Sequence, residues 1–185
     1  MKKLLSLLII LVAFSACETD VKFNDPGFQA RKDNFLWRSD LTAAGFESDD
    51  VTVDPNNGVM TITANKGLEI VTLKLPFNLT VPINKLSPLV YQYGYNNVDS
   101  STDDEISASY VYAEDATSLE YVAGFGFNED LIDKGNIQIT VNAYDPVEKT
   151  ISGFFKFNAK YQGDSSLVPE NVNFQEGAFY NIPIF

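Results

Sequence analysis

A single cysteine stands at the end of an export signal, where its thiol can accept a lipid. Residues 1–3 form a short basic start, residues 4–14 form an apolar run too short to span a bilayer, and two small residues precede Cys17. This order is typical of a bacterial lipoprotein signal, which is cleaved before a cysteine that carries a diacylglyceryl group. The sequence therefore predicts a signal peptide over residues 1–16 and lipid attachment at Cys17.

One expected strand carries tyrosine at three alternate positions, Tyr91, Tyr93 and Tyr95, so that the three rings should project from the same face. On an exposed face, such a row could stack against sugar rings while the hydroxyls form hydrogen bonds. The opposite face carries Gln92 and Asn96, which is typical of a solvent side and places the tyrosines in the core instead. The sequence favours the core, and the glycan platform is the alternative.

The lack of other reactive side chains excludes several kinds of active site. The chain has no histidine, and Cys17 is its only cysteine. A Ser-His-Asp or Cys-His nucleophile and a histidine-ligated zinc or iron site are therefore impossible. No phosphate-binding or dinucleotide-binding glycine loop occurs, and we expect no cofactor. The 25 acidic residues leave one enzymatic alternative, a glycan hydrolase with two carboxylates, which the sequence does not locate.

Two acidic segments, residues 99–105 and residues 128–133, are rich in the hard oxygen ligands that calcium prefers. Neither segment follows the ligand spacing of a calcium-binding loop. We interpret both as solvated loops between strands and expect no metal site.

The charge of the chain limits its partners. The formal net charge is −12, and removal of Lys2 and Lys3 with the signal leaves 11 basic side chains against 25 acidic ones. Such a surface repels nucleic acid and anionic lipid headgroups, so neither is an expected partner. Since 45% of the residues are hydrophobic and 13% are aromatic, the chain is expected to fold rather than to remain disordered.

The remaining sequence consists of short β-rich runs separated by turn residues. Residues 17–27 read as a lipidated tether, and residues 28–185 as a single domain. The clearest elements are residues 136–144 and 150–161, in which apolar and polar side chains alternate on either side of a short turn. About ten to twelve strands, without a window of helical periodicity, predict an all-β fold: an antiparallel β-sandwich or a flattened β-barrel.

The core should form around the second strand of this hairpin. Its inward face is the most continuously apolar in the chain and includes Phe155 and Phe157. The only tryptophan, Trp37, is expected in the core or at its edge.

Four segments carry a resemblance to a known family: residues 23–30, 35–38, 137–157 and 176–184. Together they resemble an uncharacterised family of Bacteroidota lipoproteins, a domain of unknown function. The resemblance spans nearly all of the chain after the signal, and residues 80–130 carry the least of it. It implies a lipid-anchored domain without an assigned activity, so that no site residue is transferred from it.

These observations predict a lipid-anchored, non-enzymatic β-domain of the cell envelope with a binding or structural role. The anchor would hold it at the outer membrane or the cell surface, and a periplasm-facing position is nearly as well supported. The expected partners are the membrane, through the lipid, and a glycan or another envelope protein. Two alternatives stay open: a carboxylate-based, glycan-acting envelope enzyme and an accessory subunit of an envelope complex.

Overall fold

The computed structural model of the protein describes residues 27–40, 51–54, 58–76, 88–95, 105–114, 117–125, 135–164 and 166–184; the predicted signal peptide and Cys17 lie outside them. All regular elements in these ranges are strands, which confirms the all-β prediction. They are β1 (Gly27–Lys32), β2 (Phe35–Arg38), β3 (Val51–Asp54), β4 (Val59–Lys66), β5 (Glu69–Pro76), β6 (Leu89–Tyr93), β7 (Ile106–Glu114), β8 (Thr117–Phe125), β9 (Asn136–Asp145), β10 (Thr150–Tyr161) and β11 (Asn171–Pro183).

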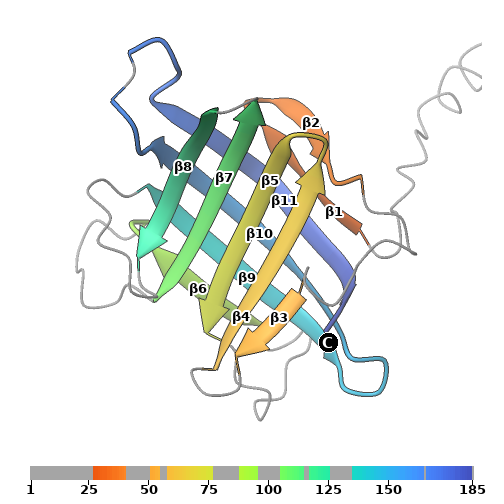
Figure 1. Ribbon diagram of the computed structural model, residues 1–185. Helices are drawn as coiled ribbons and strands as arrows, with labels where there is room; N and C mark the ends of the chain where they lie inside the picture. Colours follow the sequence, from red (N-terminus) through yellow and green to blue (C-terminus); the bar gives the residue numbers. More distant parts are fainter. Residues whose placement is uncertain are drawn as a thin grey trace, which may run out of the picture.

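The eleven strands form one antiparallel sheet that folds into two layers (Figure 1). The five-strand layer contains β3, β4, β5, β7 and β8, and the six-strand layer contains β6, β9, β10, β11, β1 and β2. Strand β10 joins the layers, because most of it pairs with β9 while its last residues, Lys160 and Tyr161, pair with β8. The result is a nearly closed, flattened barrel, one of the two architectures that the sequence predicts.

The hairpin of β9 and β10 matches the strongest sequence pattern in the chain. Its turn is stabilised by Asp145, whose Oδ1 accepts the backbone N–H of Val147 at 2.8 Å and that of Glu148 at 3.0 Å. These two backbone hydrogen bonds hold the pKa of Asp145 below its usual value, because they favour the charged carboxylate. Lys149 completes the turn with a positive φ of 50°.

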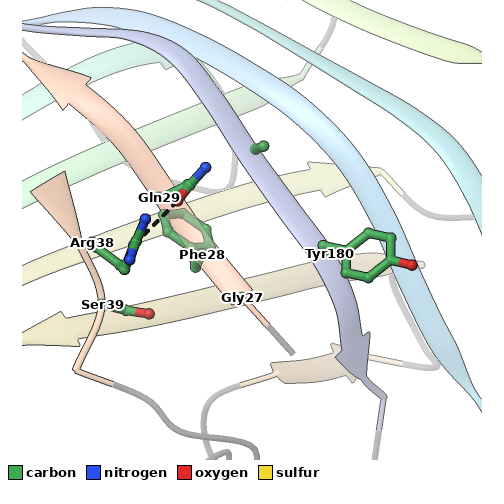
Figure 2. Close-up of a pocket in the computed structure, with 7 residues that line it drawn as sticks. Gly27, Phe28, Gln29, Arg38, Ser39 and Tyr180 are labelled. Atoms are coloured by element: carbon green, nitrogen blue, oxygen red, sulfur yellow. Dashed lines mark hydrogen bonds between the residues drawn. The ribbon is translucent and has the colours of Figure 1, made fainter. Parts of the chain in front are cut away.

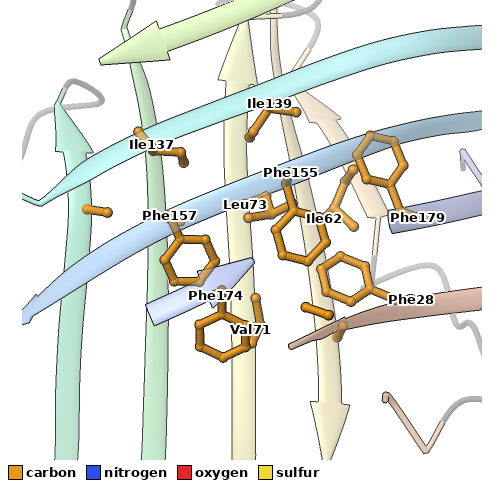
Figure 3. Close-up of a cluster of buried hydrophobic side chains, with 14 of the residues drawn as sticks. Phe28, Ile62, Val71, Leu73, Ile137, Ile139, Phe155, Phe157, Phe174 and Phe179 are labelled. Atoms are coloured by element: carbon orange, nitrogen blue, oxygen red, sulfur yellow. The ribbon is translucent and has the colours of Figure 1, made fainter. Parts of the chain in front are cut away.

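The core fills the space between the two layers, as Figure 3 shows for phenylalanine rings facing aliphatic side chains. The rings of Phe157 and Phe174 stack with centroids 4.6 Å apart, and those of Phe28 and Phe155 lie 4.8 Å apart. Trp37 is 1% exposed and meets Phe28 and Phe174 edge-on. The predicted core positions of Trp37, Phe155 and Phe157 are therefore confirmed. The five-strand layer contributes, among others, Ile62, Val71 and Leu73.

Candidate binding surface

The outward face of the six-strand layer carries two adjoining grooves over β9, β10 and β11. The Ser152 groove has a volume of about 600 Å³, and its lining includes Asn142, Ser152, Phe154, Tyr180 and Asn181. The Lys156 groove has a volume of about 450 Å³, and its lining includes Gln29, Gln138, Thr140, Lys156 and Glu176. Phe154 and Ala178 line both grooves, so the two hollows form one continuous surface.

Irregular strand pairing hollows out this face. Near Ser152, the register shifts in the pairing of β10 with both of its neighbouring strands. On β9 the extra residue is Asn142. On β11, Tyr180 and Asn181 together oppose Ser152. A second irregularity on β11 centres on Glu176, which adopts a positive φ of 50°. Each such bulge bends its strand and redirects neighbouring side chains, which is why bulges are frequent beside binding sites. Both grooves therefore lie where the ladder departs from regular pairing.

Two aromatic rings stand exposed on this surface. Phe154 is 55% exposed and Tyr180 is 46% exposed, although the strands around them have buried phenylalanines on their inner side. In Figure 2, Tyr180 projects from β11 away from Gln29 and Arg38, which are joined by a hydrogen bond of 3.2 Å from Arg38 Nε to Gln29 Oε1. A separate hollow of about 10 Å³, lined by residues that include Phe28, Arg38 and Tyr180, has room for one water molecule at most.

The Ser152 groove is mainly apolar, and its described lining contains amide and hydroxyl groups but no charged side chain. Ser152 Oγ accepts the backbone N–H of Asn181 at 2.9 Å and donates to its Oδ1 at 3.4 Å, which fixes both side chains. Asn142 Oδ1 is buried and accepts no hydrogen bond from any part of the chain that the structure describes. The groove thus offers amide and hydroxyl groups beside aromatic rings, a combination suited to hydrogen bonding and stacking rather than to acid–base chemistry.

The Lys156 groove contains charged side chains of both signs. Glu176 forms an ion pair of 3.0 Å with Arg31, and both side chains are largely exposed. Lys156 Nζ lies 4.5 Å from the centroid of the Tyr95 ring, within the range of a cation–π contact. Burial raises the pKa of Tyr95, which keeps its hydroxyl protonated.

The structure separates the three tyrosines that sequence alternation places on one face. Tyr91 and Tyr93 pair with Ile139 and Ile137 and pack against the core. Tyr95 follows Gly94, whose positive φ of 71° interrupts the alternation, and contacts Lys156 on the outer face. The prediction of one row is therefore wrong for Tyr95.

The exposed pair Phe154 and Tyr180 was missed by sequence reasoning. In β10 the side chains of Ile151, Phe155 and Phe157 are buried, so Phe154 belongs to the polar face of an otherwise alternating strand. An aromatic residue on the solvent side of a strand is the signal that identifies such a position.

A polar cluster connects the two layers at a different place in the barrel. Glu69 Oε2 on β5 accepts hydrogen bonds from Lys32 Nζ at 2.9 Å and from Trp37 Nε1 at 2.7 Å. Lys32 Nζ also donates to Tyr110 OH on β7 at 2.8 Å. Lys32 and Trp37 belong to the six-strand layer, whereas Glu69 and Tyr110 belong to the five-strand layer, so this inter-layer cluster ties the two together.

The inter-layer cluster is expected to make the free energy of unfolding fall as the pH rises into the alkaline range. Burial acts to lower the pKa of Lys32, but its hydrogen bonds to Glu69 and Tyr110 outweigh that effect and the pKa lies above the usual value. Burial raises the pKa of Tyr110 as well. A raised folded-state pKa stabilises the fold fully below the unfolded pKa and loses that contribution as pH rises through the folded value.

We expect the stability of the wild-type chain to fall as the pH rises above about 10, the range of unfolded lysine and tyrosine. Lys32→Met and Tyr110→Phe should each flatten this decline, because each removes a group whose pKa differs between the folded and unfolded states. Urea unfolding measured between neutral pH and pH 11 checks the effect. Identical pH profiles for all three proteins would show that the inter-layer cluster does not contribute.

The structure bears only in part on the acidic segments considered for calcium and on membrane-spanning helices. The acidic segments 99–105 and 128–133 lie outside the described residues, apart from Glu105. Within the ranges that the structure covers, no three metal-ligating side chains come together. In the same ranges, no helix has the length and apolar character needed to cross a bilayer.

Comparison with known proteins places the chain in a family. Its residues 24–183 match the model of a family described as Domain of unknown function (DUF6252). No curated protein and no solved structure matches the chain. The match covers the described strands from first to last and confirms the expected membership of a family without an assigned activity. The protein belongs to the DUF6252 family.

Proposed function

We propose that the chain is a lipid-anchored protein of the cell envelope whose β-domain binds a ligand without catalysing a reaction. The observation that carries the proposal is the outward surface formed by the two grooves, with exposed Phe154 and Tyr180 among amide and hydroxyl side chains. Exposed aromatic rings in a hollow surface are typical of binding sites, since they gain most from leaving water when a ligand covers them.

The composition of the grooves supports binding over hydrolysis. A glycan hydrolase places two carboxylates about 5–10 Å apart on either side of the bond that it cleaves. The residues that line the two grooves include one carboxylate, Glu176, which is held by Arg31. Among the residues that the structure describes, this surface therefore lacks the pair that the enzymatic alternative needs.

The envelope location rests on the sequence of the N-terminus. The basic start, the apolar run and the small residues before Cys17 support lipid attachment at its thiol. Two or more acyl chains would anchor the protein durably, since each buried CH₂ contributes about 0.8 kcal/mol. We propose the outer membrane or the cell surface as its location. Gly27 pairs with Tyr180, so the chain enters the domain beside the Ser152 groove.

Replacement of Cys17 by alanine should abolish acyl labelling and release the protein from the membrane fraction. The fold should be unchanged, because residue 17 precedes β1, the first of the described strands. Metabolic labelling with a fatty-acid analogue, followed by fractionation, measures both effects. A Cys17→Ala variant that still incorporates label would rule out the anchor, and protease treatment of intact cells would separate a surface position from a periplasmic one.

The binding role is tested with cell envelopes isolated from the cells in which the protein resides. All proteins in this assay carry Cys17→Ala, so that the lipid anchor cannot hold them on the membranes. The full-length chain should co-sediment with these envelopes, and Phe154→Ala should reduce the bound fraction. Val147→Ala is the matched control, because Val147 is 85% exposed and lies in the β9–β10 turn, outside both grooves. Equal co-sedimentation of both variants and the wild type would remove this surface from the binding role.

A further inference from the structure

We infer that the ligand of this surface is a neutral polysaccharide, held in the Ser152 groove with Phe154 and Tyr180 as stacking rings. The inference rests on the proposed binding function and adds the chemical class of the ligand. Three properties of the groove support it: its lack of charge, its hydrogen-bonding groups and the placement of its rings.

The lack of charge decides against ionic ligands. Of all residues in the chain 21% are charged, yet none of the described residues that line the Ser152 groove is Lys, Arg, Asp or Glu. An anionic ligand would need cationic side chains to replace its lost hydration, and a cationic ligand would need carboxylates. An uncharged ligand is the one that this lining complements.

The hydrogen-bonding groups match hydroxyls. A sugar hydroxyl both donates and accepts, and the groove presents amide and hydroxyl groups that can do either. Asn142 Oδ1 is buried without a donor among the described residues, so its amide gains a partner when it turns toward a hydroxyl in the groove. Ser152 and Asn181 are already fixed by their mutual hydrogen bonds, which lowers the entropy lost when a ligand binds.

The two rings are placed to contact one extended ligand. Phe154 pairs with Ala178, and Tyr180 follows two residues later, so the rings are diagonal neighbours on the same face. Diagonal positions on adjacent strands have Cα atoms about 7–8 Å apart. Phe154 also lines the Lys156 groove, where Gln138 and Thr140 provide further polar groups. A polymer lying across Phe154 would therefore reach both grooves.

The experiment uses the detergent-purified full-length chain in affinity electrophoresis through gels that contain defined polysaccharides. The panel contains neutral β-glucans, α-glucans, mannan and xylan, with polygalacturonate as an anionic comparison. We expect retardation by at least one neutral polymer, with little dependence on salt because no charged pair forms. Phe154→Ala should weaken this binding by about tenfold or more, Tyr180→Ala should weaken it less, and Val147→Ala should leave it unchanged.

Each result bears on the inference separately from the proposed function. If no neutral polymer retards the chain, while co-sedimentation with envelopes still depends on Phe154, the glycan class is wrong and the binding role survives. Stronger, salt-sensitive binding to polygalacturonate would also overturn the neutral class. Neutral binding that Phe154→Ala leaves unchanged would place the glycan elsewhere. Thermal unfolding of every variant checks that a lost interaction does not reflect a lost fold.

Discussion

Replacement of Phe157 by alanine should lower the free energy of unfolding by about 3–5 kcal/mol, the cost typical of truncating a buried phenylalanine. Phe157 is fully buried at the centre of the six-strand layer. Its ring stacks between Phe174, with centroids 4.6 Å apart, and Phe155, with centroids 6.1 Å apart. These neighbours belong to β10 and β11, so a cavity at this position could close only by moving paired strands.

The neighbouring strand position provides the control. Phe154 belongs to the same strand but is 55% exposed on the opposite face. Phe154→Ala should therefore lower the free energy of unfolding by less than about 1 kcal/mol. Denaturant titrations of both variants followed by circular dichroism give the comparison. A loss below about 1 kcal/mol for Phe157→Ala would show that β10 is peripheral to the core.

Glu69→Ala should have the second largest effect, a loss of about 2–4 kcal/mol. The substitution removes the acceptor of two hydrogen bonds, one from Lys32 and one from Trp37. Trp37 is 1% exposed, so its Nε1–H would be left buried without a partner. The loss of the Lys32 hydrogen bond should cost less, because the Lys32 side chain is 26% exposed and still donates a hydrogen bond to Tyr110.

Glu69→Gln separates charge from hydrogen bonding. The amide oxygen of glutamine can still accept from Trp37 Nε1, so this variant should lose only part of the stability, about 1 kcal/mol. Denaturant unfolding at neutral pH measures both variants, and tryptophan emission reports whether Trp37 becomes hydrated. Wild-type stability in Glu69→Ala would mean that the two layers do not depend on the inter-layer cluster.

Sequence alternation was sufficient for the regular parts of this fold. The predicted strands at residues 136–144 and 150–161 correspond to β9 and β10 to within one residue. They could be predicted because an alternating pattern states both the element and its buried face, without knowledge of what covers it. The aromatic core around Phe155 and Phe157 follows from the same pattern.

Alternation failed where the backbone is irregular. Gly94 turns the chain with a positive φ and sends Tyr95 to the other face from Tyr91 and Tyr93. The extra residue Asn142 on β9 has the same kind of effect opposite β10. A bulge depends on how two strands are paired. The local pattern of apolar and polar residues does not predict the pairing between segments that are distant in the sequence.

The sequence by itself determined the chemistry that this protein can use and the strands from which it is built. The lack of histidine excludes whole classes of active site, and the alternating runs specify an all-β core. Only the tertiary structure decided which side chains share a surface. Phe154 and Tyr180 flank one groove, and Glu69 joins Lys32 and Trp37, because strands far apart in sequence became neighbours. Such contacts follow from the order of strands in the folded sheet, which local patterns do not encode.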